Sequence, residues 1–259
     1  MLMKANVGVS NFRSWINGWR FVLMAILIIC SQRIVAAGGE IQNTSASPLW
    51  QVVDTNQSKC YNGTSEITCP VSGGSFYGQD AQYTSVVPSY KNNGDGTITD
   101  LKTGLMWQKT PGTKKTWTEA SNGAATLNLG GYTDWRLPSI KELYSLIEFS
   151  GTDPSGYNGT DTSTLIPFLD TKYFDFQYGD TSAGERIIDA QYTSSTKYVS
   201  TTMSGAETAF GVNFADGRIK GYGLINPSNN QATTFLVRYV RGNPGYAINS
   251  FVDNGDNTV

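Results

Sequence analysis

The stretch that decides the fold is residues 92–109, NNGDGTITDLKTGLMWQK. Its first part is rich in Asn and Gly, which favour tight turns. Two short runs with β-branched or large apolar residues follow, and Thr103-Gly104 lies between them. The second run carries the large apolar residues Leu105, Met106 and Trp107. Apolar runs joined by a short Gly-containing turn are typical of a hairpin, so the sequence predicts a strand, a turn and a second strand.

The next segment, KKTWTEASNGAATLNLGG, predicts a helix. Thr116 can cap its start, and Glu119 three residues later completes a capping box. Gly123 is unfavourable inside the helix, and Gly130-Gly131 is expected to end it.

YTDWRLPSIKELYSLIEFS, residues 132–150, predicts a second helix. Pro138 is expected to start it, since proline is favoured in the first helical turn. One apolar face follows at helical spacing: Ile140, Leu143, Leu146 and Ile147.

The second half of the domain is rich in strands. Residues 150–190 lack clear periodicity, and a long irregular stretch in a compact domain is usually functional or ordered by packing. Three strand-like segments follow at 190–199, 209–222 and 234–242, the second with a turn at Asp216-Gly217. Two early helices packed on antiparallel strands, with long irregular loops, predict the α+β class.

The hairpin stretch has a partial copy near the C-terminus. SYKNNGDGTI at 89–98 and SFVDNGDNTV at 250–259 are identical at five of ten positions, with aromatic and β-branched residues in phase. The spacing suits one domain, so 244–259 is expected to be a linker and the truncated start of a second copy. Chance similarity stays open, because Asn-Gly turns are common.

Residues 1–37 are expected to be a secretory signal peptide. Lys4, Arg13 and Arg20 precede the apolar run FVLMAILIIC, and small residues follow near Ala37. The run is shorter than the roughly 20 residues of a transmembrane helix, although an uncleaved anchor remains the alternative. We therefore expect a secreted, periplasmic or bacterial cell-surface protein that meets the membrane only through this segment before cleavage.

Composition excludes several classes of chemistry. The chain has no histidine, which excludes Ser-His-Asp and Cys-His nucleophiles and His-ligated metals. Beyond residue 37, 15 of the 19 Lys and Arg remain against 21 Asp and Glu, a balance of about −6 that disfavours nucleic-acid binding.

Residues 38–85 are polar and are expected to form an N-terminal extension with too small a core to fold alone. Cys60 and Cys69 lie nine positions apart, and in an exported chain they most simply form a disulfide that closes a small loop. The main domain is expected at 86–243.

Several of these stretches resemble a known family in the same order: NNGDGTITDLKTGLMWQK, GYTDWRLPSIKELYSLI, YTSST, FGVNFADGRIKGY and VRYVRG. Together they resemble the Lcl C-terminal domain family, a bacterial domain formerly of unknown function. The resemblance implies a C-type-lectin-like fold, export, and frequent tandem copies. For the family's namesake it implies adhesion and binding of sulfated polysaccharides. Fold alone does not choose among the functions of that superfamily.

Two groups are candidate ligand contacts. Arg218 and Lys220 follow Asp216 at a hairpin tip and can meet sulfate or carboxylate groups, although solvated surface charge is the favoured explanation. Tyr173 and Tyr178 lie in the aromatic-rich middle, where flat rings can stack on sugars or anchor a loop on the core.

Other candidates favour structural roles. Trp107 and Trp135 lie in apolar contexts typical of core packing. Arg136 needs a carboxylate partner, for which Glu142 and Asp134 are available. Residues 92–100 could offer oxygen ligands to calcium, but a Gly-rich turn explains them, so no metal or cofactor is expected.

These observations predict a non-catalytic exported binding module that adheres through a glycan or through a host or cell-surface protein. The alternative is a structural, self-associating domain of a tandem array without a small ligand. An enzyme is the least favoured class, since a carboxylate pair such as Asp170 and Asp175 is no evidence of a glycosidase without its geometry.

Overall fold

The computed structural model describes residues 52–258, which belong to one compact unit. The expected signal peptide lies outside the described residues. Antiparallel strands dominate and two α-helices accompany them, as the α+β prediction requires. No helix within 52–258 is long and apolar enough to cross a lipid bilayer.

The hairpin predicted from residues 92–109 is confirmed as β4 (Thr97–Asp100) and β5 (Met106–Gln108), with Ile98 opposite Trp107. The Asp100 carboxylate closes the turn by accepting hydrogen bonds from the backbone N–H groups of Lys102 and Thr103. β3 (Tyr90–Asn92) and β13 (Val240–Arg241) complete an antiparallel sheet of order β13-β5-β4-β3. The sheet therefore joins segments from near the start and near the end of the expected domain at 86–243.

A second sheet has the order β7-β8-β9, from Gln191–Lys197, Thr208–Asn213 and Arg218–Gly223. The Asp216-Gly217 turn joins β8 to β9 as predicted. Shorter pairs are β1 (Cys60–Tyr61) with β2 (Glu66–Ile67), β6 (Lys115–Thr116) with β12 (Thr234–Phe235), and β10 (Ile225–Asn226) with β11 (Gln231–Ala232).

The expected single strand at 234–242 is wrong, because the segment forms two short strands. Phe235 in β12 pairs with β6, Leu236 bridges to Tyr192, and Val240 in β13 pairs with β5. The segment is buried from Phe235 to Val240 and passes between different partners. No single neighbouring strand could therefore satisfy its backbone along its whole length.

The first helix, α2 (Trp117–Thr126), begins with the predicted capping box of Thr116 and Glu119. It ends at Thr126, before the expected Gly130-Gly131. Gly123 has a packing reason: a Cβ there would lie 2.6 Å from the Tyr239 hydroxyl oxygen, which donates to the Ala120 carbonyl. The glycine is therefore explained by the close approach of Tyr239, a residue distant in sequence, and not by helix propensity.

The second helix, α3 (Ile140–Tyr144), starts from Ser139 and not from Pro138. Ser139 and Glu142 form a second capping box. Leu146 and Ile147 continue in tight turns after the helix and are buried with Leu143, so the predicted apolar face persists beyond the helix itself. This face packs in the main core, and α3 lies against β7 and β8.

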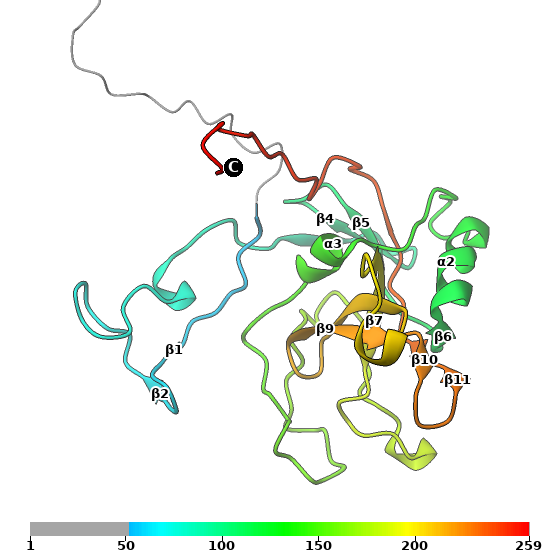
Figure 1. Cartoon of the computed structure of the whole chain (residues 1–259), viewed down its shortest axis with the longest axis horizontal. Coiled ribbons are helices and arrows are strands. Elements are labelled where there is room, and N and C mark those ends of the chain that lie inside the picture. Colours follow the sequence, from blue (N-terminus) through cyan, green and yellow to red (C-terminus); the bar gives the residue numbers. More distant parts are fainter. Residues whose placement is uncertain (1–51, 259) are drawn as a thin grey trace, which may run out of the picture. The chain divides into compact units, whose positions relative to one another are not determined.

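Residues 150–190 run as long loops apart from the 3₁₀ turn η2 (Thr181–Ala183) (Figure 1). Buried Phe168, Leu169, Phe174 and Ile187 anchor these loops on the domain. Two further 3₁₀ turns are η1 (Asp80–Gln82) and η3 (Met203–Gly205). The long segment is therefore ordered by packing, with its polar parts left at the surface.

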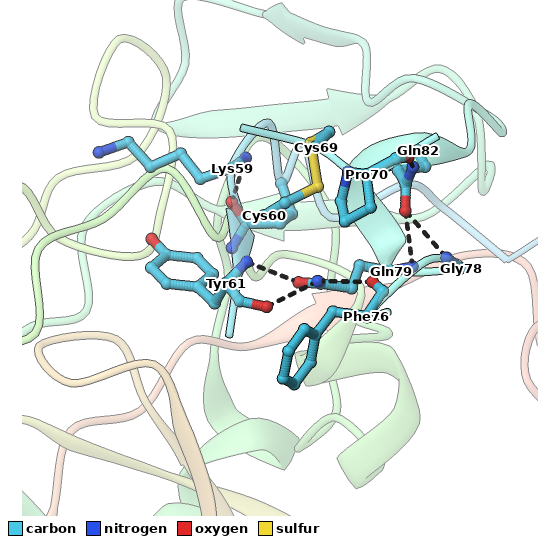
Figure 2. Close-up of a disulfide and its surroundings, with 10 residues drawn as sticks. Lys59, Cys60, Tyr61, Cys69, Pro70, Phe76, Gly78, Gln79 and Gln82 are labelled. Atoms are coloured by element: carbon cyan, nitrogen blue, oxygen red, sulfur yellow. Dashed lines mark hydrogen bonds between the residues drawn. A yellow bond between two sulfur atoms is a disulfide. The ribbon is translucent and has the colours of Figure 1, made fainter. Parts of the chain in front are cut away.

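The N-terminal extension is attached to the domain by backbone contacts. Val53 forms a parallel bridge with Val86, and the Phe149 N–H donates to the Thr55 carbonyl. The expected Cys60–Cys69 disulfide is present (Figure 2).

The turn at 253–258 repeats the bonding of the turn at 92–97. Asn254 donates from its backbone N–H to the carbonyl of Thr258 and from its side chain to the Thr258 hydroxyl, as Asn93 does to Thr97. Asp256 accepts from the N–H and hydroxyl of Thr258, as Asp95 does from Thr97. The two segments thus share a local structure, and a second copy of the domain stays a prediction.

Candidate functional site

The described residues form a groove of about 540 Å³ between the segments 154–160 and 181–188, which we call the loop groove. Both walls come from the irregular loops. Their lining mixes hydroxyl, amide and charged groups with an aromatic ring, through Ser155, Tyr157, Asn158, Glu185 and Arg186. Such a mixture can hold a polar ligand and fix its orientation.

The 181–188 wall is held in place by charged groups. Asp180 accepts from the N–H groups of Ser182 and Ala183, which caps η2. Its own N–H donates to the Glu185 carboxylate at 2.8 Å. Lys114 then joins this wall to the strands, because its ammonium donates to Glu185 at 2.5 Å and to the Asp189 carbonyl at 2.7 Å.

Arg186 presents a fixed cation at the groove. Its guanidinium donates to the Asp189 carboxylate from Nη2 at 2.7 Å and from Nε at 3.3 Å, while its side chain is 71% exposed. Burial would raise the pKa of Asp189, but hydrogen bonds from Arg186 outweigh that effect and hold it below its ordinary range. The pair therefore stays charged near neutral pH and leaves part of the guanidinium facing solvent.

Gly179 allows this wall to close. Its N–H donates to the Ile187 carbonyl at 3.0 Å. A Cβ at this position would overlap the carbonyl oxygen of Arg186. Only glycine therefore lets the two ends of the loop approach so closely.

Tyr157 supplies the aromatic surface of the opposite wall. Its hydroxyl donates to the Asp161 carbonyl at 2.9 Å, and its ring is partly exposed. A Cβ at Gly159 would overlap the ring and hydroxyl of Tyr157. The loop thus fixes the ring against its own backbone, in a position that reaches the groove.

The predicted charged cluster is adjacent to this site. Asp216 has a fully buried carboxylate that accepts from Arg218 and Lys220, each at 3.0 Å. Arg218 also donates to the groove residue Ser155 at 2.6 Å and pairs with Asp153 at 2.8 Å. Two carboxylates thus balance the two cations, and Arg218 acts on the groove through Ser155.

Tyr173 and Tyr178 lie elsewhere. Both are partly buried against the main core, Tyr173 beside Tyr90 and Tyr178 at the edge of Phe176 with ring centroids 4.9 Å apart. Burial raises the pKa of Tyr178. Neither residue lines the loop groove, so the structure does not bring the two predicted groups of ligand contacts together.

The residues assigned to structural roles lie as follows. Trp107 and Trp135 are buried, the first in the main core and the second in the cluster under α2. Arg136 forms a bidentate ion pair with Glu142, while Asp134 pairs with Arg241.

One basic residue lies in the core: Arg238 is fully buried. Its guanidinium donates to the carbonyls of Gln108, Lys109 and Asp175 and lies over the rings of Phe174 and Tyr192. The guanidinium of Arg238 bonds to backbone carbonyls and not to a carboxylate side chain. Its burial therefore could not be inferred from an acidic partner in the sequence.

The carboxylates of the segment 92–100 accept hydrogen bonds from the turns in which they lie. Asp95 accepts from Thr97 and Asp100 accepts from the next turn, so both satisfy backbone groups. Within residues 52–258 no group of three potential metal ligands is found. Asp170 and Asp175 also have separate partners, the N–H of Lys172 and the side chains of Lys109 and Thr110.

Sequence reasoning missed Asn158, Glu185 and Arg186 as site residues. Tyr157 lies in the same aromatic-rich middle as the predicted contacts Tyr173 and Tyr178. The signal that pointed here was the length of the irregular stretch 150–190, both of whose halves line the groove.

The family model of the Lcl C-terminal domain matches residues 96–241, which lie inside the expected domain of 86–243. No curated protein and no solved structure matches the chain. More than half of the sequence fits the family model, and the chain therefore belongs to the Lcl C-terminal domain family.

Proposed function

We propose that this chain is an exported, non-catalytic adhesion module that binds a glycan in the loop groove. The observation that carries the proposal is the pairing of a fixed aromatic ring, Tyr157, with a fixed cation, Arg186, across a polar groove. Sugar rings stack on exposed aromatic faces, and their hydroxyl, carboxylate or sulfate groups accept hydrogen bonds from arginine.

The rigidity of the groove supports recognition. Glycine at 159 and 179, the cap at Asp180 and the Lys114 bridge hold the walls without a ligand. A preorganised site loses less conformational entropy on binding than a mobile one. Weak polar contacts can therefore yield useful affinity.

The state of the acids supports a non-catalytic role. Hydrogen bonds from Ser182 and Ala183 hold the pKa of Asp180 low, and Arg186 does the same for Asp189. General acid–base catalysis works best with a pKa near the working pH. These carboxylates are fixed as anions and position other groups.

Export and a C-type-lectin-like fold form part of the proposal. The disulfide supports folding in an oxidising compartment. The two helices, antiparallel strands and long loops are compatible with that fold. Exposed loops on a rigid scaffold suit a surface protein that holds a partner.

A glycan array probed with the full chain tests the function. We expect binding to at least one glycan class, about tenfold weaker for Tyr157→Ala and Arg186→Ala, as for central contacts of an interface. Tyr198→Ala is a matched control, because its ring has similar exposure and lies outside the groove. Sulfated and unsulfated forms of each glycan show whether Arg186 meets sulfate.

The proposal fails if no glycan binds, or if binding is unchanged in both groove variants. Turnover of a bound glycan that Asp189→Asn abolishes would instead indicate an enzyme.

A second candidate is a structural domain of a tandem array. The shared bonding of the turns at 92–97 and 253–258 favours it, together with Phe251, which is exposed although its counterpart Tyr90 is buried in the core. Self-association of the chain in analytical ultracentrifugation, without glycan binding, would support this candidate over the first.

A further inference from the structure

The N-terminal extension contains a small module, residues 57–83, that lies outside the family match and is closed by the disulfide. We call it the clamped module. Several of its aromatic residues are exposed: Tyr61, Phe76, Tyr77 and Tyr83. A module with little core of its own would be expected to cover these rings.

The backbone at Phe76 is strained. Phe76 is the third residue of a turn in which the Tyr77 N–H donates to the Gly74 carbonyl, and its φ is 64°. That position of a turn usually takes glycine, since a positive φ is unfavourable for a bulky side chain. Its side chain is 56% exposed, so packing of the ring does not offset the strain. Strain of this kind often marks a residue kept for contact with a ligand.

The module holds Phe76 and Tyr61 in fixed positions. The Gln79 side chain accepts from the Tyr61 N–H at 2.8 Å and donates to the Tyr61 and Phe76 carbonyls at 2.7 and 2.9 Å (Figure 2). Gln82 accepts from the Gly78 N–H and donates to the Pro70 carbonyl. Figure 2 shows that neither ring points toward the disulfide. The two glutamine side chains therefore fix the backbone of the loops, while the rings of Tyr61 and Phe76 face away from the disulfide.

The electrostatics indicate an uncharged partner. The charged residues of the module are Lys59, Glu66 and Asp80. Lys59 pairs with Glu66 at 2.7 Å, and Asp80 accepts from the Thr55 hydroxyl. The module carries one cation against two carboxylates, so it offers no net positive charge to a sulfate or carboxylate group, whereas its tyrosine hydroxyls can bond to sugar hydroxyls.

We propose that the clamped module is a second contact surface, on which an uncharged polysaccharide stacks sugar rings against Phe76 and Tyr61. This proposal rests on the proposed glycan-binding function and extends it to a second site. Separate rings interspersed with polar backbone suit individual sugar rings better than the continuous apolar core of a protein interface. Two contact sites on one chain would raise its avidity for a long polymer.

Affinity electrophoresis of the full chain in gels containing a soluble neutral polysaccharide, β-glucan or mannan, tests this surface. We expect the wild type to be retarded, and the apparent affinity read from the retardation to fall about tenfold in Phe76→Gly, as for the loss of a central contact. Phe76→Gly also relieves the positive φ, so its melting temperature should equal or exceed that of the wild type. If the Phe76 ring served only to stabilise the fold, Phe76→Gly would lower the melting temperature. Tyr198→Ala is the control for loss of an exposed ring.

Tyr157→Ala in the same gels separates the two proposals. Retardation lost with Phe76→Gly and kept with Tyr157→Ala supports the module surface independently of the groove. Retardation lost only with Tyr157→Ala overturns the module surface and leaves the groove proposal standing. A drop in the melting temperature of Phe76→Gly, or binding to dextran sulfate alone, also overturns the module surface.

Discussion

Replacement of Glu142 by glutamine tests the ion pair at the start of α3. The Glu142 side chain is only 4% exposed and accepts from Arg136 Nη1 and Nη2 at 2.6 and 2.5 Å. It also accepts from the Ser139 N–H at 2.8 Å, which completes the capping box. Glutamine keeps an oxygen for the cap but loses the charge and one of the two acceptors for arginine.

The magnitude follows from the burial of the two partners. Breaking a fully buried ion pair costs about 3 to 5 kcal/mol, because the remaining charge is left without compensation. The Arg136 side chain is 38% exposed, so water can partly solvate its charge in the variant. We therefore expect the free energy of unfolding to fall by about 2 kcal/mol, or about 4 to 8 °C in Tm for a unit of this size.

Urea denaturation followed by circular dichroism measures this loss, with Asp134→Asn as the matched control. Asp134 also bonds twice to an arginine, Arg241, at 2.6 and 3.1 Å, but its side chain is 60% exposed. Exposed pairs contribute little, so the control should leave the unfolding midpoint within error of the wild type. Equal losses in the two variants, or none in Glu142→Gln, would refute the reasoning from burial.

Three further predictions concern the groove and the extension. Gly179→Ala places a Cβ against the Arg186 carbonyl, so it should lower the melting temperature and weaken glycan binding together; an unchanged binding isotherm would contradict the fixed wall. Reduction of the Cys60–Cys69 bond, with a sequence separation of nine, should lower stability by about 2.5 kcal/mol through loop entropy, as read from melting with and without reductant; no shift would show that the bridge constrains little. The pKa of Asp189 lies below its ordinary 3.8, so its stabilising effect is present above about pH 4 and is lost as pH falls further; Asp189→Asn should therefore show a shallower decline in stability between about pH 4 and 2, and identical curves would count against the pair.

Much of the local structure could be predicted because it depends on neighbouring residues. The hairpin at 92–109 follows from its turn residues, and the capping box of α2 follows from a hydroxyl and a glutamate three positions apart. The same spacing at Ser139 and Glu142 marks the start of α3, which was wrongly predicted at Pro138. The hydrogen bonds of these turns and caps join residues within five positions of one another. A sequence read in short windows contains all the information that they need.

The candidate site could be predicted only in outline. The irregular stretch 150–190 was recognised as functional or packed, but Tyr157 and Arg186 lie 29 positions apart within it. Their common place in the groove depends on how the loops fold back on the domain, where Phe168 is buried in the main core and Ile187 is buried as well. Sequence spacing carries no record of that geometry.

The sequence by itself determined the class of the protein: an α+β domain of the Lcl C-terminal family, with its turns, its caps and its disulfide. Only the tertiary structure decided that Arg238 is buried under carbonyls, that Gly123 makes room for Tyr239, and that two loops enclose a groove. The physical reason is how far apart in the sequence the interacting residues lie. Turns and caps are satisfied by hydrogen bonds between near neighbours, whereas burial and grooves arise from contacts between residues that only the folded chain brings together.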